Sequence, residues 1–289
     1  MEFDEGLAGS PNDLDSGALK VTVLSDLGDF PQAKELLETL AGVHGEHRSI
    51  VLVRGHLHMA EGQFNQDIDA FLKAHALEET PESMSTLYRA LRTAGRADEG
   101  IKLLQSWILH HADDIGTRHA LGQGLVSLNR FDEARDVYEV LRANGIEDIV
   151  LLNNLAVVYQ RLGDERALTI AKLAYEKAPE ASSILDTYGW ILTENGKPGE
   201  GLTMLRDAFA RSSTGPEIRF HTGLAWMKMG KNAEAIVELE AALRSENRFA
   251  DFGTAEAMLE KLRGGYLARL IWSACTLRRE SVLLHYVQS

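Results

Sequence analysis

Histidines are the residues of this chain whose type and spacing come nearest to a metal site. His56 and His58 are two residues apart, which on a helix points them to different faces. No Glu-x-x-His pattern follows them. His110 and His111 are adjacent at an expected helix end, where positive charge suits the helix dipole. We interpret all four as surface or capping histidines, and we predict no bound metal.

The other chemical patterns also favour a chain without catalysis. Gly122-x-Gly124 falls inside an expected helix and follows no strand, so it is not a dinucleotide-binding loop. The glutamates around Thr80-Pro81 are interpreted as solvated helix ends. Cys275 has no neighbouring His–Asp context and, as the single cysteine, excludes an internal disulfide. The sequence therefore predicts neither an enzyme nor a cofactor.

Binding chemistry is better represented. Arg89 and Arg92 are three residues apart, so one helix would present both guanidinium groups on the same side, where they could hold a carboxylate or an acidic sugar. This function depends on a scaffold that places the helix beside others. The internal repeats of the chain indicate which elements form that scaffold.

A ladder of turn residues runs through most of the chain. Its steps are 33 or 34 residues, and such a regular spacing argues against a generic helical bundle. Five residues after most of these turns comes a small residue; Asp67 is an exception, and Ala167 follows its glycine after four residues. The turn residues are Gly28, Gly62, Gly95, Asn129, Gly163, Gly196 and Gly230.

The ladder resembles the tetratricopeptide repeat, a pair of antiparallel helices (A, then B) joined by a tight turn. The resemblance implies an all-α, right-handed α-solenoid of about seven hairpins with a C-terminal capping helix, which curves around a concave groove. Gly17 and Lys20 stand where packing residues belong, so we expect a weak or frayed first hairpin. The expected regions are a flexible acidic N-terminus (1–13), the repeat array (14–250), the capping helix (251–262) and a basic, apolar tail (263–289). The tail either is disordered, loosely packed or foreign to the fold, or forms an extra amphipathic helix that docks on the stack or on a membrane surface.

The inner face of each helix A would line the groove and bind a protein or peptide ligand, or alternatively a glycan. Heat-shock-chaperone adaptors of this family use a carboxylate clamp of Lys, Asn and Arg. This chain has Ser85, Arg89 and Val150 at clamp positions, which disfavours that role. The predicted groove residues are Arg89, Arg92, His119, Gln123, Asn153, Gln160, Asp186, Trp190 and Phe220. Among them, Trp190 and Phe220 are expected to form an apolar platform.

Two pieces of the C-terminal third suggest a narrower setting. The residues Asp186-Thr187-Tyr188-Gly189-Trp190 and Pro216 to His221 resemble the ends of tetratricopeptide lipoproteins of the PEP-CTERM/exopolysaccharide system. That resemblance implies a scaffold for exopolysaccharide export or envelope protein sorting. Two alternatives remain open: a cytoplasmic protein–protein adaptor, and the repeat region of a larger transferase.

Charge and hydropathy limit the partners and the location. The formal net charge is −13, and because the tail from Arg263 contributes +3, the rest of the chain carries −16. Such an acidic body repels a phosphate backbone, so nucleic acid is not expected as a partner. The sequence shows no signal peptide and no transmembrane segment. Localisation in the periplasm or at the outer membrane is expected if the chain is a fragment of the lipoprotein family, and in the cytoplasm otherwise.

Overall fold

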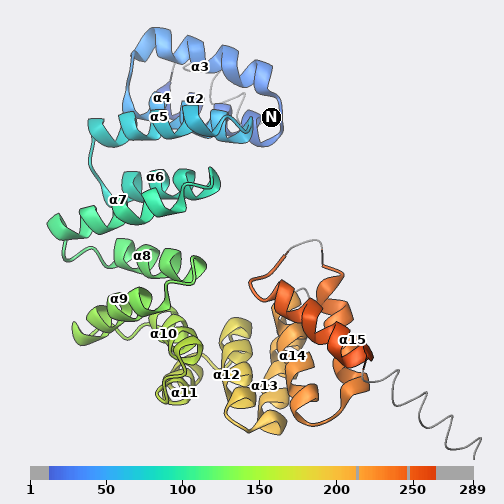
Figure 1. Cartoon of the computed structure of the whole chain (residues 1–289). Helices are drawn as coiled ribbons and strands as arrows, with labels where there is room; N and C mark the ends of the chain where they lie inside the picture. Colours follow the sequence, from blue (N-terminus) through green and yellow to red (C-terminus); the bar gives the residue numbers. More distant parts are fainter. Residues whose placement is uncertain (1–12, 213–214, 246–247, 265–289) are drawn as a thin grey trace, which may run out of the picture. The chain divides into compact units, whose positions relative to one another are not determined.

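Seven helical hairpins form the described part of the protein (Figure 1). The structure is a computed structural model that describes residues 13–212, 215–245 and 248–264. Within those residues every regular element is a helix, which confirms the all-α prediction. The A helices are α2 (Leu14–Asp26), α4 (Arg48–Ala60), α6 (Pro81–Thr93), α8 (Ile115–Ser127), α10 (Ile149–Leu162), α12 (Ser182–Glu194) and α14 (Pro216–Lys228). The B helices are α3 (Phe30–His44), α5 (Phe64–Leu77), α7 (Ala97–His110), α9 (Phe131–Ala143), α11 (Ala167–Lys177), α13 (Pro198–Arg211) and α15 (Asn232–Leu243).

The turn of each hairpin is made by the residue that the ladder identifies. All seven ladder residues have positive φ, between 58° at Asn129 and 77° at Gly28 and Gly196. Glycine adopts this left-handed conformation without steric cost, and asparagine is the side chain that tolerates it best. The next residue's N–H then donates to the carbonyl five residues back, as from Arg96 to Leu91 at 2.8 Å. This closure ends each helix A and reverses the chain.

Side-chain caps fix where several helices begin. Asp13, Asp29, Asp114 and Asp148 each accept a hydrogen bond from a backbone N–H in the first turn of the next helix. Thr80 and Ser83 form a reciprocal capping box at the start of α6. These bonds satisfy N–H groups that have no partner inside the helix, so the start of each capped helix is specified locally.

Small residues allow the two helices of a hairpin to approach closely. A Cβ added at Gly122 of α8 would lie 2.4 Å from Cε1 of Tyr138, a fully buried side chain of α9. In the first hairpin, a Cβ at Gly17 would lie 2.7 Å from both methyl groups of Leu40. Gly17 is therefore a packing position, because it makes room for Leu40, and α2 is formed with Asp13 as its cap, while the expected weakness of this hairpin stays a prediction.

Contacts divide the chain into two units, Met1–Leu141 and Arg142–Ser289, which we describe separately. In the second unit a helix over residues 252–264 follows α15, with Ala255 and Leu259 buried, as the predicted cap requires. Among the described helices, none combines the length and apolar character needed to cross a membrane. The predicted flexible N-terminus, apart from Asp13, and the predicted tail beyond residue 264 lie outside the described residues.

Candidate binding faces

The A helices of the first unit present two exposed arginines. Arg89 and Arg92 of α6 are both exposed, and neither has an ion-pair partner within the described ranges. His56 of the preceding A helix, α4, is partly buried: burial lowers its pKa, and the Arg89 guanidinium lowers it further. On α8, Gln123 is exposed and His119 is half-buried. The A helices of the first unit thus present two exposed guanidinium groups, together with side chains that can form hydrogen bonds.

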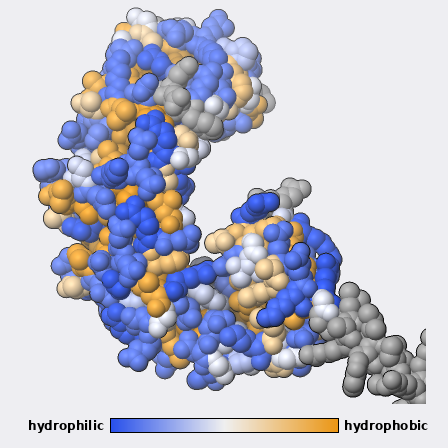
Figure 2. Space-filling model, in the orientation of Figure 1, coloured by the Kyte–Doolittle hydropathy of each residue, from blue (hydrophilic) through white to orange (hydrophobic). Residues whose placement is uncertain are grey.

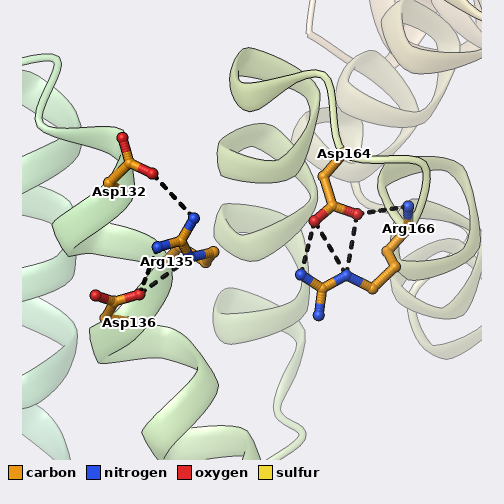
Figure 3. Close-up of polar contacts among 5 residues, drawn as sticks. All are labelled: Asp132, Arg135, Asp136, Asp164 and Arg166. Atoms are coloured by element: carbon orange, nitrogen blue, oxygen red, sulfur yellow. Dashed lines mark hydrogen bonds and ion pairs between the residues drawn. The ribbon is translucent and has the colours of Figure 1, made fainter.

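Many other arginines are neutralised by nearby carboxylates. Arg135 of α9 pairs with Asp132 at 2.9 Å and with Asp136 at 2.8 Å. Arg166 binds Asp164 in the turn before α11 through both its side chain and its backbone N–H (Figure 3). Figure 2 shows hydrophilic residues over much of the visible surface, with hydrophobic residues in patches between them. Against this background the free guanidinium groups of α6 are distinctive.

A buried carboxylate lies within the same unit. Asp67 of α5 is fully buried, and both of its carboxylate oxygens lack a hydrogen-bond partner among the described atoms. Burial raises the pKa of Asp67, while the amide of Ile68 and the charge of His58 oppose that rise. The position belongs to the row of small residues that lets the helices of each hairpin approach. An acidic side chain there destabilises the fold, since a buried unpaired carboxylate loses its hydration.

In the second unit, the two pieces of sequence that resemble the lipoprotein family meet. The Nδ1 atom of His221 on α14 lies 2.8 Å from the carboxylate of Asp186 on α12. The His221 ring stacks on Trp190, with centroids 5.2 Å apart and planes 11° from parallel. Both motifs therefore have a structural role, because they join two successive A helices.

Trp190 and Phe220 are packed against the protein's own chain. Trp190 is 8% exposed, and the guanidinium of Arg161 lies 5.0 Å from its ring centroid. Phe220 is 3% exposed and contacts Phe249, which follows α15, at 5.6 Å between ring centroids. Arg161 in turn donates from both terminal nitrogens to the carboxylate of Asp251. The apolar platform that the sequence predicts is thus covered: Arg161 of α10 lies over Trp190, and Phe249, from beyond the last hairpin, packs on Phe220.

The remaining predicted groove residues of this unit are polar and half-buried. Gln160 of α10 accepts a hydrogen bond from the side chain of Asn195 at 3.2 Å. Asn153 carries a buried side-chain oxygen without a partner in the described part of the chain. Sequence reasoning missed Arg161 and Asp251, which are 90 residues apart. The nearest signal was the segment from Phe249 to Phe252, which places two aromatic residues and an acid next to the predicted cap.

One Ser–His contact resembles part of a catalytic arrangement. The Ser83 hydroxyl lies 2.6 Å from Nδ1 of His75, but Ser83 is 2% exposed and its hydroxyl is part of the capping box of α6. The pair therefore holds the junction between α5 and α6, and a substrate has no access to it. Among the described residues there is also no cluster of three His, Cys, Asp or Glu side chains that could hold a metal ion.

Comparison with known proteins agrees with this architecture. Residues 19–83, which comprise most of the first hairpin, the second hairpin and the start of α6, match the family model described as the tetratricopeptide repeat. A search of curated proteins finds no match. A solved tetratricopeptide repeat protein from Parabacteroides merdae is similar over 86% of this chain and 98% of its own, with a TM-score of 0.67 and 11% identity. A chain of the APC/C hetero-tetramer Cut9–Hcn1 is similar over 90% of this chain and 51% of its own, with a TM-score of 0.62 and 16% identity. The match over residues 19–83 and these structural similarities show that the described chain has the α-solenoid fold of tetratricopeptide repeat proteins.

Proposed function

We propose that this protein is a non-catalytic scaffold that binds a partner protein, and that the A-helix face of the first unit holds an acidic peptide segment of that partner. The observation that carries the proposal is the pair Arg89 and Arg92, which are exposed on one helix and have no ion-pair partner within the described chain. In a protein of net charge −13, two free guanidinium groups at this spacing are a specific feature.

The geometry suits an extended carboxylate-bearing ligand. Residues three apart on a helix lie on the same side, about 5–6 Å apart at Cβ. Each guanidinium can bind a carboxylate through two parallel hydrogen bonds, which fixes orientation as well as charge. His56 and Gln123 on the flanking A helices would add hydrogen bonds to the ligand backbone. Exposed ion pairs contribute about 0–1 kcal/mol each, so the arginines would select and orient the ligand.

The finer setting that we propose is bacterial exopolysaccharide export or envelope protein sorting. Its support is the sequence resemblance of the pieces ending at Trp190 and His221. Two alternatives are a cytoplasmic protein–protein adaptor and the repeat region of a larger transferase. The sequence upstream of this chain in its gene discriminates among them: a lipoprotein signal favours the first setting, a plain start the second, and a fused Rossmann-like domain the third.

The test is a pull-down from the native host with the repeat chain as bait. The wild type is compared with Arg89→Gln/Arg92→Gln and with a control that also removes two exposed positive charges, Lys102→Gln/Lys172→Gln. We expect the arginine variant to lose at least about tenfold of a captured partner that the lysine variant retains. An acidic peptide from that partner should then bind the wild type in fluorescence anisotropy. Equal capture by both variants would exclude the first unit's face as the binding site.

A further inference from the structure

The chain that follows α15 lies on the A-helix face of the second unit. Asp251 contacts Arg161 of α10, and Phe249 contacts Phe220 of α14. Phe220 and Trp190 are both among the predicted groove residues. The Arg161 guanidinium lies over the Trp190 ring. The face that would take a ligand in this unit is therefore occupied by a short piece of the same chain, residues 248–252.

The contacts of this piece are those of a bound peptide. The Asp251 carboxylate accepts hydrogen bonds from both terminal nitrogens of Arg161. Bidentate pairs of this kind are among the strong hydrogen bonds of proteins. The aromatic residue of this piece, two positions earlier, is 7% exposed and packs on an aromatic side chain of the receptor face. The backbone then turns away into the helix over 252–264, where the Asp251 carbonyl accepts from Ala255 at 2.9 Å. An aromatic anchor and an acid two residues later thus carry the recognition.

We infer that residues 248–252 are a built-in competitor, and that the second unit's face takes a partner segment of the same chemistry, an aromatic residue followed two positions later by a carboxylate. This inference rests on the proposed function. It adds a second binding face, names the class of ligand which that face takes, and says how access to the face is controlled. Tethering gives a short segment an effective concentration on the order of mM, so even weak intrinsic contacts keep it in place. Among the described residues, one aromatic contact and one ion pair join this piece to the A helices, and the side chains of the ion pair are 31% and 17% exposed, so a stronger ligand can displace it.

The experiment uses the full chain and a fluorescein-labelled peptide of residues 245–254, SENRFADFGT, in fluorescence anisotropy. The opened variant is Phe249→Ser/Asp251→Asn, and the control is Glu256→Gln, an exposed residue of the following helix. We expect the opened variant to bind the peptide at least about tenfold more tightly than the wild type or the control. Adding Arg161→Gln to the opened variant should abolish that gain, as should a peptide carrying the same two substitutions.

A second measurement covers the case in which the opened variant fails to fold. Circular dichroism checks its helix content, and the milder Asp251→Asn chain replaces it if helix content falls. In that chain, faster hydrogen exchange over 248–252 should accompany tighter peptide binding. Equal binding by wild type and opened chain, no binding by any variant, or binding that persists without Arg161 would each overturn the inference. Loss of binding here with retained Arg89-dependent capture would leave the proposed function standing.

Discussion

His221 and Asp186 join two successive A helices of the second unit, with Nδ1 of the imidazole 2.8 Å from the carboxylate. Their side chains are 10% and 14% exposed, so the contact is largely shielded from water. The ring of His221 also stacks on Trp190, which in turn carries the Arg161 guanidinium on its ring. One histidine therefore links α12 to α14 and supports the face on which residues 248–252 lie.

We expect His221→Ala to lower the free energy of unfolding of the second unit by about 2–3 kcal/mol. The change removes an aromatic stack and leaves a largely buried carboxylate without its partner. Urea unfolding followed by hydrogen exchange in α12 and α14 measures the loss. His110→Ala, at an exposed histidine of α7, is the matched control and should change stability little. A loss no larger than the control's would mean that the contact is not stabilising.

Asp67→Ala should stabilise the first unit by about 1–3 kcal/mol at neutral pH, because it removes a buried carboxylate that has no side-chain hydrogen-bond partner among the described residues. Asp69→Ala, on the same helix but exposed, should have little effect. Thermal unfolding of both variants against the wild type gives the comparison.

The gain from Asp67→Ala should also depend on pH. Burial raises the pKa of Asp67 in the folded chain above its ordinary carboxyl value, so the folded state holds the proton more tightly than the unfolded state does. The contribution of Asp67 to wild-type stability is fully present below the pKa that its carboxyl has in the unfolded chain. That contribution is lost as the pH rises through its pKa in the folded chain. The advantage of the alanine variant should therefore shrink on acidification toward pH 4. A difference that stays constant with pH would contradict this account.

Asp114→Ala should destabilise the junction between α7 and α8 by about 2 kcal/mol. The carboxylate accepts from the backbone N–H and the hydroxyl of Thr117, at 2.9 and 2.7 Å, and from the indole N–H of Trp107 at 2.8 Å. Partial burial acts to raise the pKa of Asp114, but these hydrogen bonds outweigh it, and the net pKa is lowered. The contribution of Asp114 to stability is thus present above the pKa that its carboxyl has in the unfolded chain, and it is lost as the pH falls through its pKa in the folded chain. This pH dependence is the reverse of that expected for Asp67. Tryptophan fluorescence during urea unfolding at several pH values would report both the loss of stability in the variant and its dependence on pH.

Gly122→Ala should lower stability by about 1–3 kcal/mol, although alanine is the better helix former. The new methyl group would meet the Tyr138 ring at 2.4 Å. Gly116→Ala is the control in the same helix, where the nearest atom beyond the helix backbone and adjacent residues is 3.5 Å from the added Cβ. That variant should be neutral or slightly stabilising. Equal effects of the two substitutions on urea unfolding would show that α8 and α9 can separate at no cost.

The sequence by itself determined the hairpins. Each turn needs a glycine or asparagine in the left-handed conformation and a backbone hydrogen bond to a carbonyl five residues back. Both depend on a few consecutive residues, so the ladder from Gly28 to Gly230 located all seven turns. The small residues at close approaches, such as Gly122, repeat with the same period for the same reason. Arg89 and Arg92 could be placed on one side of α6 from helical spacing alone, and the structure finds both exposed.

Only the tertiary structure decided which A-helix residues are open to a ligand. Trp190 and Phe220 occupy groove positions by spacing, yet they are buried, because Arg161 and Phe249 reach them from other parts of the chain. The bond between Arg161 and Asp251 spans 90 residues, and no local pattern encodes such a contact. Helical periodicity fixes the side of a helix on which a residue lies. What covers that side depends on where the chain returns, and that is set by packing between elements far apart in the sequence.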